Sequence, residues 1–251
     1  SPHLGHGRSA VVFDFFIRYL KYLNYSVLFV RNITDIDDKI IEKSKEKNID
    51  YRELGDNVWN EFVIAHENLN CLVPDIEPRA TAYIPEIIKY IEQLILNGFG
   101  YVTSSGVYYD VSQFEEYLEL SGRSIEEVRT GTRVETEEDK KRAEDFALWK
   151  FSKEGEPSWD SPWGDGRPGW HIECSTMISE TLGKTIDFHC GGIDLIFPHH
   201  ENEIAQSKGV DINENFANYW LHNGMLNLSG KKMSKSEGNV KLLNEYIDEY
   251  G

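Results

Sequence analysis

The spacing of apolar side chains changes from segment to segment along the first fifty residues, and each spacing predicts a helix or a strand. From Ser9 to Leu23 nearly every non-polar position is large, so we predict a helix that is apolar on most of its surface and therefore buried. Residues 26–30 are a short β-branched and aromatic run, typical of a parallel strand buried on both faces. Residues 35–47 place acids early and lysines late, which predicts an amphipathic helix. This order indicates α/β layering.

The middle of the chain has a different pattern. A helix is predicted over 84–96, and two strand runs, 101–103 and 107–109, flank a Ser-Ser-Gly turn typical of a hairpin. Residues 135–144 are rich in charge, so we expect them to be solvated. A helix followed by a hairpin predicts a subdomain inserted between two α/β portions, from about residue 53 to 143.

The α/β pattern returns after this stretch. The predicted elements are a strand over 146–151, a helix over 169–182, a strand over 185–189, a tight loop at Gly191-Gly192 and a helix from Pro198. We therefore predict an α/β fold with a parallel sheet, interrupted by an inserted α+β subdomain.

The composition of the 251 residues limits the class of protein. A hydrophobic content of 40% favours a packed globule, and no apolar run approaches the roughly 20 residues of a membrane span. The net charge of −17 argues against a globally basic nucleic-acid surface, although a local lysine patch can bind phosphates. Three cysteines are too few for a disulfide framework, so we expect a reducing, cytoplasmic location. The chain starts in what looks like the middle of a motif, without a signal peptide or an initiator Met, so we expect a truncated chain.

A short motif, His3-Leu4-Gly5-His6, precedes the first helix. Backbone N–H groups and the helix dipole attract anions at this end, and two imidazoles beside a glycine could donate to phosphate oxygens. The alternative is a polar helix start with two solvated histidines. The motif alone does not decide between them.

A second motif, Lys232-Met233-Ser234-Lys235-Ser236, lies near the other end of the chain. Lysines that alternate with small hydroxyl residues between glycines are typical of a loop that closes over a polyphosphate. The alternative is a solvated lysine loop, which composition alone favours. The two motifs together favour nucleotide binding.

A third group of residues has the chemistry of metal ligands. His199 and Glu203 are four residues apart at a helix start, so their side chains share one face, and Cys174 belongs to another helix with Trp170 one turn before it. Cysteine, histidine and carboxylate ligands with one open position are typical of catalytic zinc. The alternatives are a buried apolar cysteine and an ordinary surface pair.

These motifs resemble those of class I aminoacyl-tRNA synthetases, in which HLGH and KMSKS form a signature pair. Three further segments are similar to cysteinyl-tRNA synthetases, and the resemblance runs from His3 to Val240: RNITDIDDK (31–39), GWHIECS (169–175) and FPHHENEIAQS (197–207). It implies a Rossmann-like nucleotide-binding core made of residues 1–52 and 144–240, a connective subdomain over 53–143, and the start of a helical region over 241–251.

The resemblance also implies the roles of individual residues. Catalytic residues would be His3, His6, Lys232 and Lys235. ATP would be bound by His3, Gly5, His6, Gly191, Gly192, Asp194, Met225, Leu226 and Lys235. Trp170, His171 and His189 would form the amino-acid pocket, and Cys174, His199 and Glu203 would hold Zn²⁺. A fourth zinc ligand and the first strand of the nucleotide fold would precede Ser1. Cys190 stands where the family commonly has glycine, and we interpret it as a small neutral residue rather than a ligand.

The implied reaction is the activation of L-cysteine by ATP with Mg²⁺, followed by transfer to the 3′ end of tRNA(Cys), in a monomer without a membrane anchor. Zinc would distinguish the substrate thiolate from a serine hydroxyl, which pocket shape does weakly. Two alternatives stay open. A related ligase passes cysteine to an amino sugar, and a non-enzymatic paralogue would only bind nucleotide.

Overall fold

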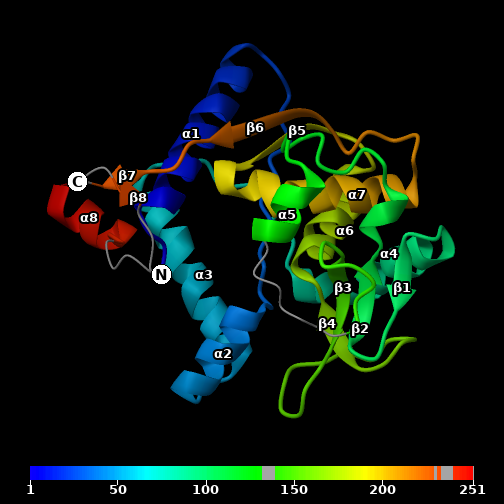
Figure 1. Cartoon of the computed structure of the whole chain (residues 1–251). Helices are drawn as coiled ribbons and strands as arrows, with labels where there is room; N and C mark the ends of the chain where they lie inside the picture. Colours follow the sequence, from blue (N-terminus) through cyan, green and yellow to red (C-terminus); the bar gives the residue numbers. More distant parts are fainter. Residues whose placement is uncertain (132–138, 229–230, 233–239, 251) are drawn as a thin grey trace. The chain divides into compact units, whose positions relative to one another are not determined.

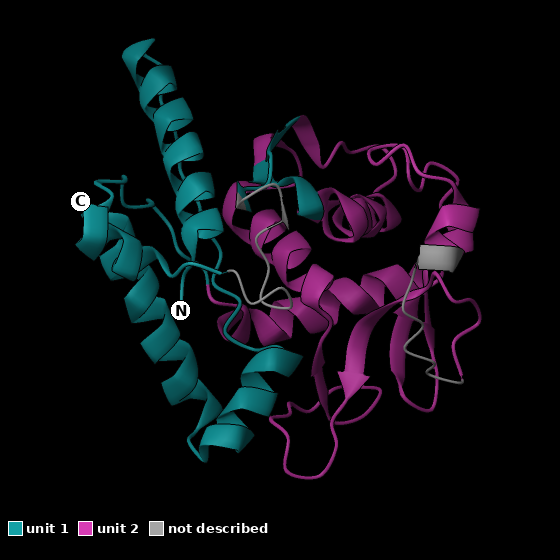
Figure 2. Cartoon of the chain, turned by 60° about the vertical axis from the view of Figure 1, so that its left-hand side comes forward, with its two compact units in different colours: residues 1–78, 190–194, 220–251 teal, residues 79–189, 195–219 magenta. Residues whose placement is uncertain are grey.

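The computed structural model describes residues 1–131, 139–228, 231–232 and 240–250. Contacts within the chain divide it into two compact units, coloured separately in Figure 2. Unit 1 consists of residues 1–78, 190–194 and 220–251, and unit 2 of residues 79–189 and 195–219. The predicted division at residue 53 falls inside a continuous helix, α3 (Tyr51–Asn68). The extent of the inserted subdomain stays a prediction.

Unit 1 is mostly helical (Figure 1). α1 (Leu4–Tyr22), α3 and α8 (Leu243–Tyr250) pack on one another, and α2 (Asp38–Lys47) packs on α3. The contact between α1 and α8 is close at Gly7, where a Cβ atom would lie 2.7 Å from Cδ1 of Leu243. The helix predicted over 9–23 is α1, and the helical start predicted for 241–251 is α8.

The predicted burial of α1 is wrong for the described residues. Ile17 is 7% exposed, but Phe15 is 71% exposed and Tyr19 51% exposed. Within unit 1 the helix packs chiefly on α3 and α8, which cover part of its circumference. Apolar residues around the whole helix are therefore not evidence that every side is buried in this chain.

The strand predicted over 26–30 is also wrong. Only Val30 pairs, in an isolated parallel bridge with Ile76, and Leu28 is 55% exposed. The extended backbone continues to Ile33, whose N–H donates to the Pro78 carbonyl oxygen over 2.8 Å. The β-branched run favours extended backbone. Its hydrogen bonds with residues 75–78 are too irregular to form a strand.

α2 begins three residues later than predicted because of its cap. The Asp37 carboxylate accepts a hydrogen bond from the Ile40 N–H over 2.6 Å, and this fixes the first helical residue at Asp38. The helix ends at Asn48, which adopts a left-handed conformation with φ of 52°.

Unit 2 contains an antiparallel sheet in the order β1-β2-β3-β4. Its strands are β1 (Gly100–Val102), β2 (Gly106–Tyr109), β3 (Phe146–Phe151) and β4 (Gly166–Pro168). The predicted hairpin is β1–β2, and the predicted strand over 146–151 is β3. We expected β3 in the returning parallel core, but it pairs with the hairpin, so this part of the sheet prediction is wrong. Gly106 permits the pairing, because a Cβ there would lie 2.2 Å from the Trp149 carbonyl oxygen.

Helices cover this sheet and enclose the core of unit 2. They are α4 (Ile84–Leu96), α5 (Ile125–Gly131), α6 (Trp170–Leu182) and α7 (Glu201–Val210), with short 3₁₀ turns at Ala80–Tyr83 and Val111–Gln113. Ile87, Ile91 and Leu94 repeat along one face of α4 and are fully buried. α4 packs on both α6 and α7, so the core lies directly behind the two helices that carry the predicted metal ligands.

The parallel part of the fold is a two-stranded sheet of β5 (Ile186–Gly192) and β6 (Ala217–Asn223). The Ile186 N–H donates to the Phe216 carbonyl oxygen over 3.0 Å, and this bond joins the starts of both strands, as a parallel pair requires. Gly191 and Gly192 belong to β5, so the tight loop predicted there is wrong, and a 3₁₀ turn at Ile193–Leu195 follows instead.

The helix predicted from Pro198 begins at Glu201. A π-helical turn over Ile196–His200 precedes it and contains Phe197 in a non-helical conformation. Part of the charged stretch over 135–144 lies outside the described residues. Its last residue, Glu144, is not solvated as expected: it is 8% exposed and pairs with Arg129 over 2.7 Å.

Candidate functional site

The three predicted metal ligands meet in unit 2. Cys174 comes from α6, His199 from the π-helical turn and Glu203 from α7, and their ligand atoms all lie within 4.8 Å of one another. All three side chains are buried, with exposures of 6%, 5% and 0%. We call Cys174, His199 and Glu203 the metal group. The i, i+4 spacing has the predicted effect, since Nε2 of His199 lies 3.1 Å from Oε1 of Glu203.

The charges of the metal group depend on burial and on two imidazoles. Burial alone would raise the pKa of Glu203, but the adjacent rings of His189 and His199 outweigh it and hold this pKa well below its usual range. Burial raises the pKa of the Cys174 thiol, and the carboxylates of Glu203 and Glu173 raise it further. Glu203 is therefore a carboxylate beside the protonated thiol of Cys174.

The metal group fits zinc. Oε1 of Glu203 is buried, lies 3.1 Å from Nε2 of His199 and is one of the ligand atoms that meet in this group. A buried carboxylate oxygen of this kind has an electron pair available for a cation. Sulfur, imidazole nitrogen and carboxylate oxygen are ligands that zinc accepts together, and binding of the ion would displace the thiol proton.

The residues predicted for the amino-acid pocket surround the metal group. The Trp170 ring lies over His199 at 4.2 Å between ring centres and is 45% exposed. Nδ1 of His171 lies 2.9 Å from Nδ1 of His199, and burial lowers the pKa of His171 to about 3, so this ring is neutral. Nε2 of His189, on β5, lies 2.6 Å from Oε2 of Glu203. Aromatic rings therefore surround the metal group, and the His171 ring is neutral.

One residue of this cluster was not predicted from the sequence. His200 is 1% exposed and forms with His189 and Glu203 a second group whose ligand atoms lie within 4.8 Å. The adjacent pair His199-His200 was the available signal. Neighbouring residues on a regular helix point in different directions, whereas here they lie in a π-helical turn.

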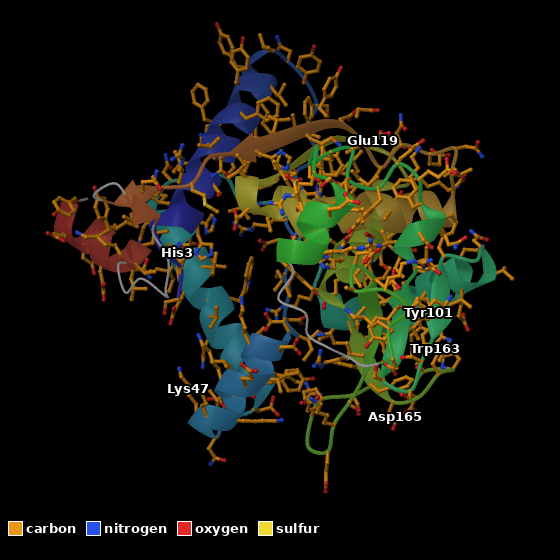
Figure 3. The ribbon with its side chains drawn as sticks, in the orientation of Figure 1. His3, Lys47, Tyr101, Glu119, Trp163 and Asp165 are labelled. Atoms are coloured by element: carbon orange, nitrogen blue, oxygen red, sulfur yellow. The ribbon has the colours of Figure 1, made fainter. Side chains whose placement is uncertain are left out.

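The predicted phosphate-binding residues belong to unit 1. His3 caps α1, and its ring stacks on that of His6 at 3.7 Å (His3 is labelled in Figure 3). The His3 N–H donates to Nδ1 of His6 over 3.0 Å. Nδ1 of His6 is therefore an acceptor, and the proton of the neutral ring is on Nε2, which makes Nε2 the donor. Gly5 lies between them in the first turn.

Only the first residue of the lysine motif is described. Lys232 lies in the short strand β8 (Lys231–Lys232), which pairs with β7 (Asn227–Leu228), and Lys235 lies outside the described residues. Farther along the chain, the Lys241 carbonyl oxygen accepts a hydrogen bond from the Leu4 N–H over 3.1 Å. This bond occupies one amide at the start of α1 that we expected to be open to phosphate.

The other predicted ATP contacts also lie in unit 1. Gly191 and Gly192 end β5, and Asp194 is exposed in the following turn. A Cβ atom at Gly192 would lie 2.6 Å from Oδ1 of Asp194, so the glycine leaves room for this carboxylate. Met225 and Leu226 follow β6 and are partly buried, and the Met225 carbonyl oxygen accepts a hydrogen bond from Arg8 over 3.2 Å.

None of the helices described by the structure combines the length and the apolar character needed to cross a membrane. This finding agrees with the absence of a long apolar run in the sequence.

Comparisons with curated proteins give close relatives. The chain is 51% identical over 248 residues to "Cysteine--tRNA ligase" of Aquifex aeolicus (strain VF5), covering 99% of this chain and 50% of the relative. It is 52% identical over 252 residues to the protein of the same name from Actinobacillus pleuropneumoniae serotype 5b (strain L20), covering 99% and 54%. The chain spans about half the length of the curated relatives it matches.

Solved structures show the fold. Methionyl-tRNA synthetase of Mycobacterium tuberculosis, bound by methionyl-adenylate, superposes with a TM-score of 0.75 at 15% identity, covering 100% of this chain and 60% of that one. A putative arginyl-tRNA synthetase of Campylobacter jejuni gives a TM-score of 0.57 at 15% identity, covering 100% and 57%. The predicted α/β class, of the Rossmann-like synthetase kind, is confirmed.

The family comparison covers the whole sequence. Residues 1–251 match the family described as tRNA synthetases class I (C) catalytic domain. The resemblance inferred from the motifs is confirmed, and the chain belongs to the family of class I (C) tRNA synthetase catalytic domains.

Proposed function

We propose that this chain is the catalytic region of a cysteine–tRNA ligase, which forms cysteinyl-adenylate and passes the cysteinyl group to the 3′ end of tRNA(Cys). The observation that carries the proposal is the metal group, whose ligand atoms lie within 4.8 Å of one another beside the exposed face of Trp170. Curated relatives with 51% and 52% sequence identity to this chain are named "Cysteine--tRNA ligase".

The chain's own residues select the substrate. Cys174, His199 and Glu203 would hold Zn²⁺, and a bound zinc ion supplies a soft Lewis acid that binds a thiolate far better than a serine hydroxyl. Trp170 would form the apolar wall beside this position, and the neutral His171 and the His189 ring, which contacts Glu203, would line the amino-acid pocket. This arrangement suits a small thiol.

The activation step needs no protein nucleophile. The cysteine carboxylate attacks the α-phosphorus of ATP, the bond to the bridging oxygen breaks, and pyrophosphate leaves with Mg²⁺. His3 and His6 would donate to the phosphate oxygens, with Nε2 of His6 as the protonated donor set by the hydrogen bond at Nδ1. Lys232 and Lys235 would neutralise the leaving pyrophosphate. Gly191, Gly192, Asp194, Met225 and Leu226 would bind the adenosine.

Pyrophosphate exchange tests the proposal. With L-cysteine, the zinc-loaded chain should exchange pyrophosphate into ATP, whereas L-serine should give at least about 100-fold less exchange. Cys174→Ala should abolish the cysteine-dependent exchange. Retained exchange with unchanged cysteine preference would contradict the proposed selection by the metal group.

The acceptor is tested separately. We propose tRNA(Cys) as the acceptor because the relatives are named for it, and we place the enzyme in the cytoplasm as a monomer. The full-length protein should charge tRNA(Cys) and leave an amino sugar such as a glucosamine-inositol unreacted. Transfer to the sugar alone would support the alternative ligase.

A further inference from the structure

A buried carboxylate beside the metal group has no part in the proposed chemistry. Glu201 is 1% exposed and lies two residues after His199. Its Oε1 accepts hydrogen bonds from the N–H groups of Leu118 (3.0 Å) and Leu120 (3.3 Å), and its Oε2 accepts one from Ser121 (2.9 Å). Three backbone donors compensate the charge that burial would otherwise make costly.

The backbone around these donors is shaped to converge on the carboxylate. Leu118 is buried, yet it adopts a left-handed conformation with φ of 81°, which a branched side chain rarely takes. Its carbonyl oxygen accepts a hydrogen bond from the Gly122 N–H over 2.9 Å, which closes the turn. Such a turn directs successive N–H groups into one concavity that binds an anion, and the Glu201 carboxylate occupies it.

The same segment also contacts the start of α7 and the π-helical turn that carries His199. The Tyr117 hydroxyl donates to Oδ1 of Asn202 over 2.5 Å, and the Arg123 guanidinium lies over the Phe197 ring at 4.7 Å. We call residues 117–123 the brace. The brace contacts residues 197, 201 and 202. These positions lie on both sides of His199 in the sequence and directly before Glu203.

The turn that carries His199 departs from regular helical geometry. It is a π-helical turn with Phe197 in a non-helical conformation, and the N-cap of α7, His200, makes no side-chain capping hydrogen bond. Regular helical hydrogen bonds therefore do not by themselves fix His199 relative to Cys174 on α6. Trp170 and His171 of α6 contact the His199 ring directly, and the contacts with the brace hold the backbone on either side of it.

We propose that Glu201 is a positioning residue for the metal group, and that the brace acts through its carboxylate to hold His199 and Glu203 in ligating positions. The inference rests on the proposed zinc site. Glu201 itself belongs to neither candidate metal cluster of the described residues, because its carboxylate is bonded to the amides of the brace.

The test compares two charge-removing variants of the 251-residue chain. Glu201→Gln replaces one carboxylate oxygen by an NH₂ group that cannot accept from a brace amide. Glu119→Gln is the matched control, because Glu119 is an exposed acid of the same brace (Figure 3). Zinc affinity is measured by competition with a chromogenic chelator, and the site geometry by the visible absorption of the Co²⁺-substituted proteins.

We expect Glu201→Gln to lower zinc affinity about tenfold or more, within the range found when groups that orient metal ligands are changed, and to alter the Co²⁺ spectrum. Glu119→Gln should match the wild type in both. A Glu201→Gln protein with wild-type zinc affinity and spectrum would overturn the inference, even if its unfolding temperature fell, because that role would be structural only.

Failure of the zinc site itself gives a different result. If the wild type bound neither Zn²⁺ nor Co²⁺, the proposed function would fail and this inference with it. If Glu201→Gln did not fold, Tyr117→Phe would serve instead, since it removes the hydroxyl bonded to Asn202 and keeps the ring. Severalfold weaker zinc binding would support the role of the brace, and unchanged binding would contradict it.

Discussion

The metal group and the residues proposed to bind the nucleotide are built in different ways. The side chains of the metal group come from α6, α7 and the π-helical turn before α7, and each is nearly inaccessible to solvent. The proposed nucleotide-binding residues of unit 1 lie at the ends of elements, with Asp194 exposed and His3 and His6 partly buried at a helix start. The difference agrees with their proposed tasks, since ion selection needs fixed, dehydrated ligands whereas a polyphosphate must enter and leave.

The largest expected effect is on zinc binding when a cysteine of the metal group is replaced. Cys174→Ser should weaken zinc binding by at least about 100-fold, because a hydroxyl replaces the one soft ligand among the described residues of the metal group. Cys190→Ser is the matched control, because Cys190 belongs to neither candidate metal cluster of the described residues and burial raises its thiol pKa to about 11. Zinc affinity is measured by competition with a chelator. An equal loss of affinity in both variants would contradict the assignment of Cys174, rather than Cys190, to the metal group.

The next effect concerns the helix start of unit 1. His6→Ala should lower the kcat of cysteine-dependent pyrophosphate exchange by roughly 100-fold, the usual cost of losing one donor to a developing negative charge. Zinc content should stay at the wild-type value, because the metal group draws only on residues of unit 2. A variant that loses zinc, or that changes only the KM for ATP, would contradict the separation of roles.

Core packing gives a smaller contrast between the two units. Ile91→Ala in α4 should lower the free energy of unfolding by about 2–5 kcal/mol, because the side chain is fully buried. Phe15→Ala in α1 should cost less than about 1 kcal/mol in this chain, because Phe15 is 71% exposed. Denaturant unfolding measures both, and a larger loss at Phe15 would show that its helix face is covered.

The smallest effect is a pH dependence at Asp139. Hydrogen bonds from the hydroxyl groups of Ser104 and then Ser105 lower the pKa of Asp139 to about 2. A folded-state pKa below the unfolded value near 4 contributes stability above pH 4, and this contribution is lost as the pH falls toward 2. The stability difference between the wild type and Asp139→Asn should therefore shrink between pH 5 and pH 2. A constant difference would indicate that the carboxylate charge contributes nothing.

The sequence predicted those parts of the molecule that local rules determine. The hairpin, α4, α6 with its terminal Gly183 and the shared face of His199 and Glu203 follow from turn residues and periodicity. The partners of each element do not follow from such rules. β3 has the composition of a core strand, but its pairing with β2 depends on contacts between residues far apart in the sequence. The exposure of Phe15 depends on such contacts too.

The site shows the same limit. The motifs identified the members of the metal group by residue type, but His200 and Glu201 were not predicted. The place of His200 depends on a π-helical turn, and that of Glu201 on backbone amides of the brace, neither of which follows from periodicity.

X-ray absorption at the zinc edge, on the zinc-loaded chain with and without substrate, tests the central claim most directly. The account predicts one sulfur neighbour at about 2.3 Å without substrate, from Cys174, and a second after addition of L-cysteine but not of L-serine. Zinc without a sulfur neighbour, or a sulfur count that L-cysteine leaves unchanged, would contradict it.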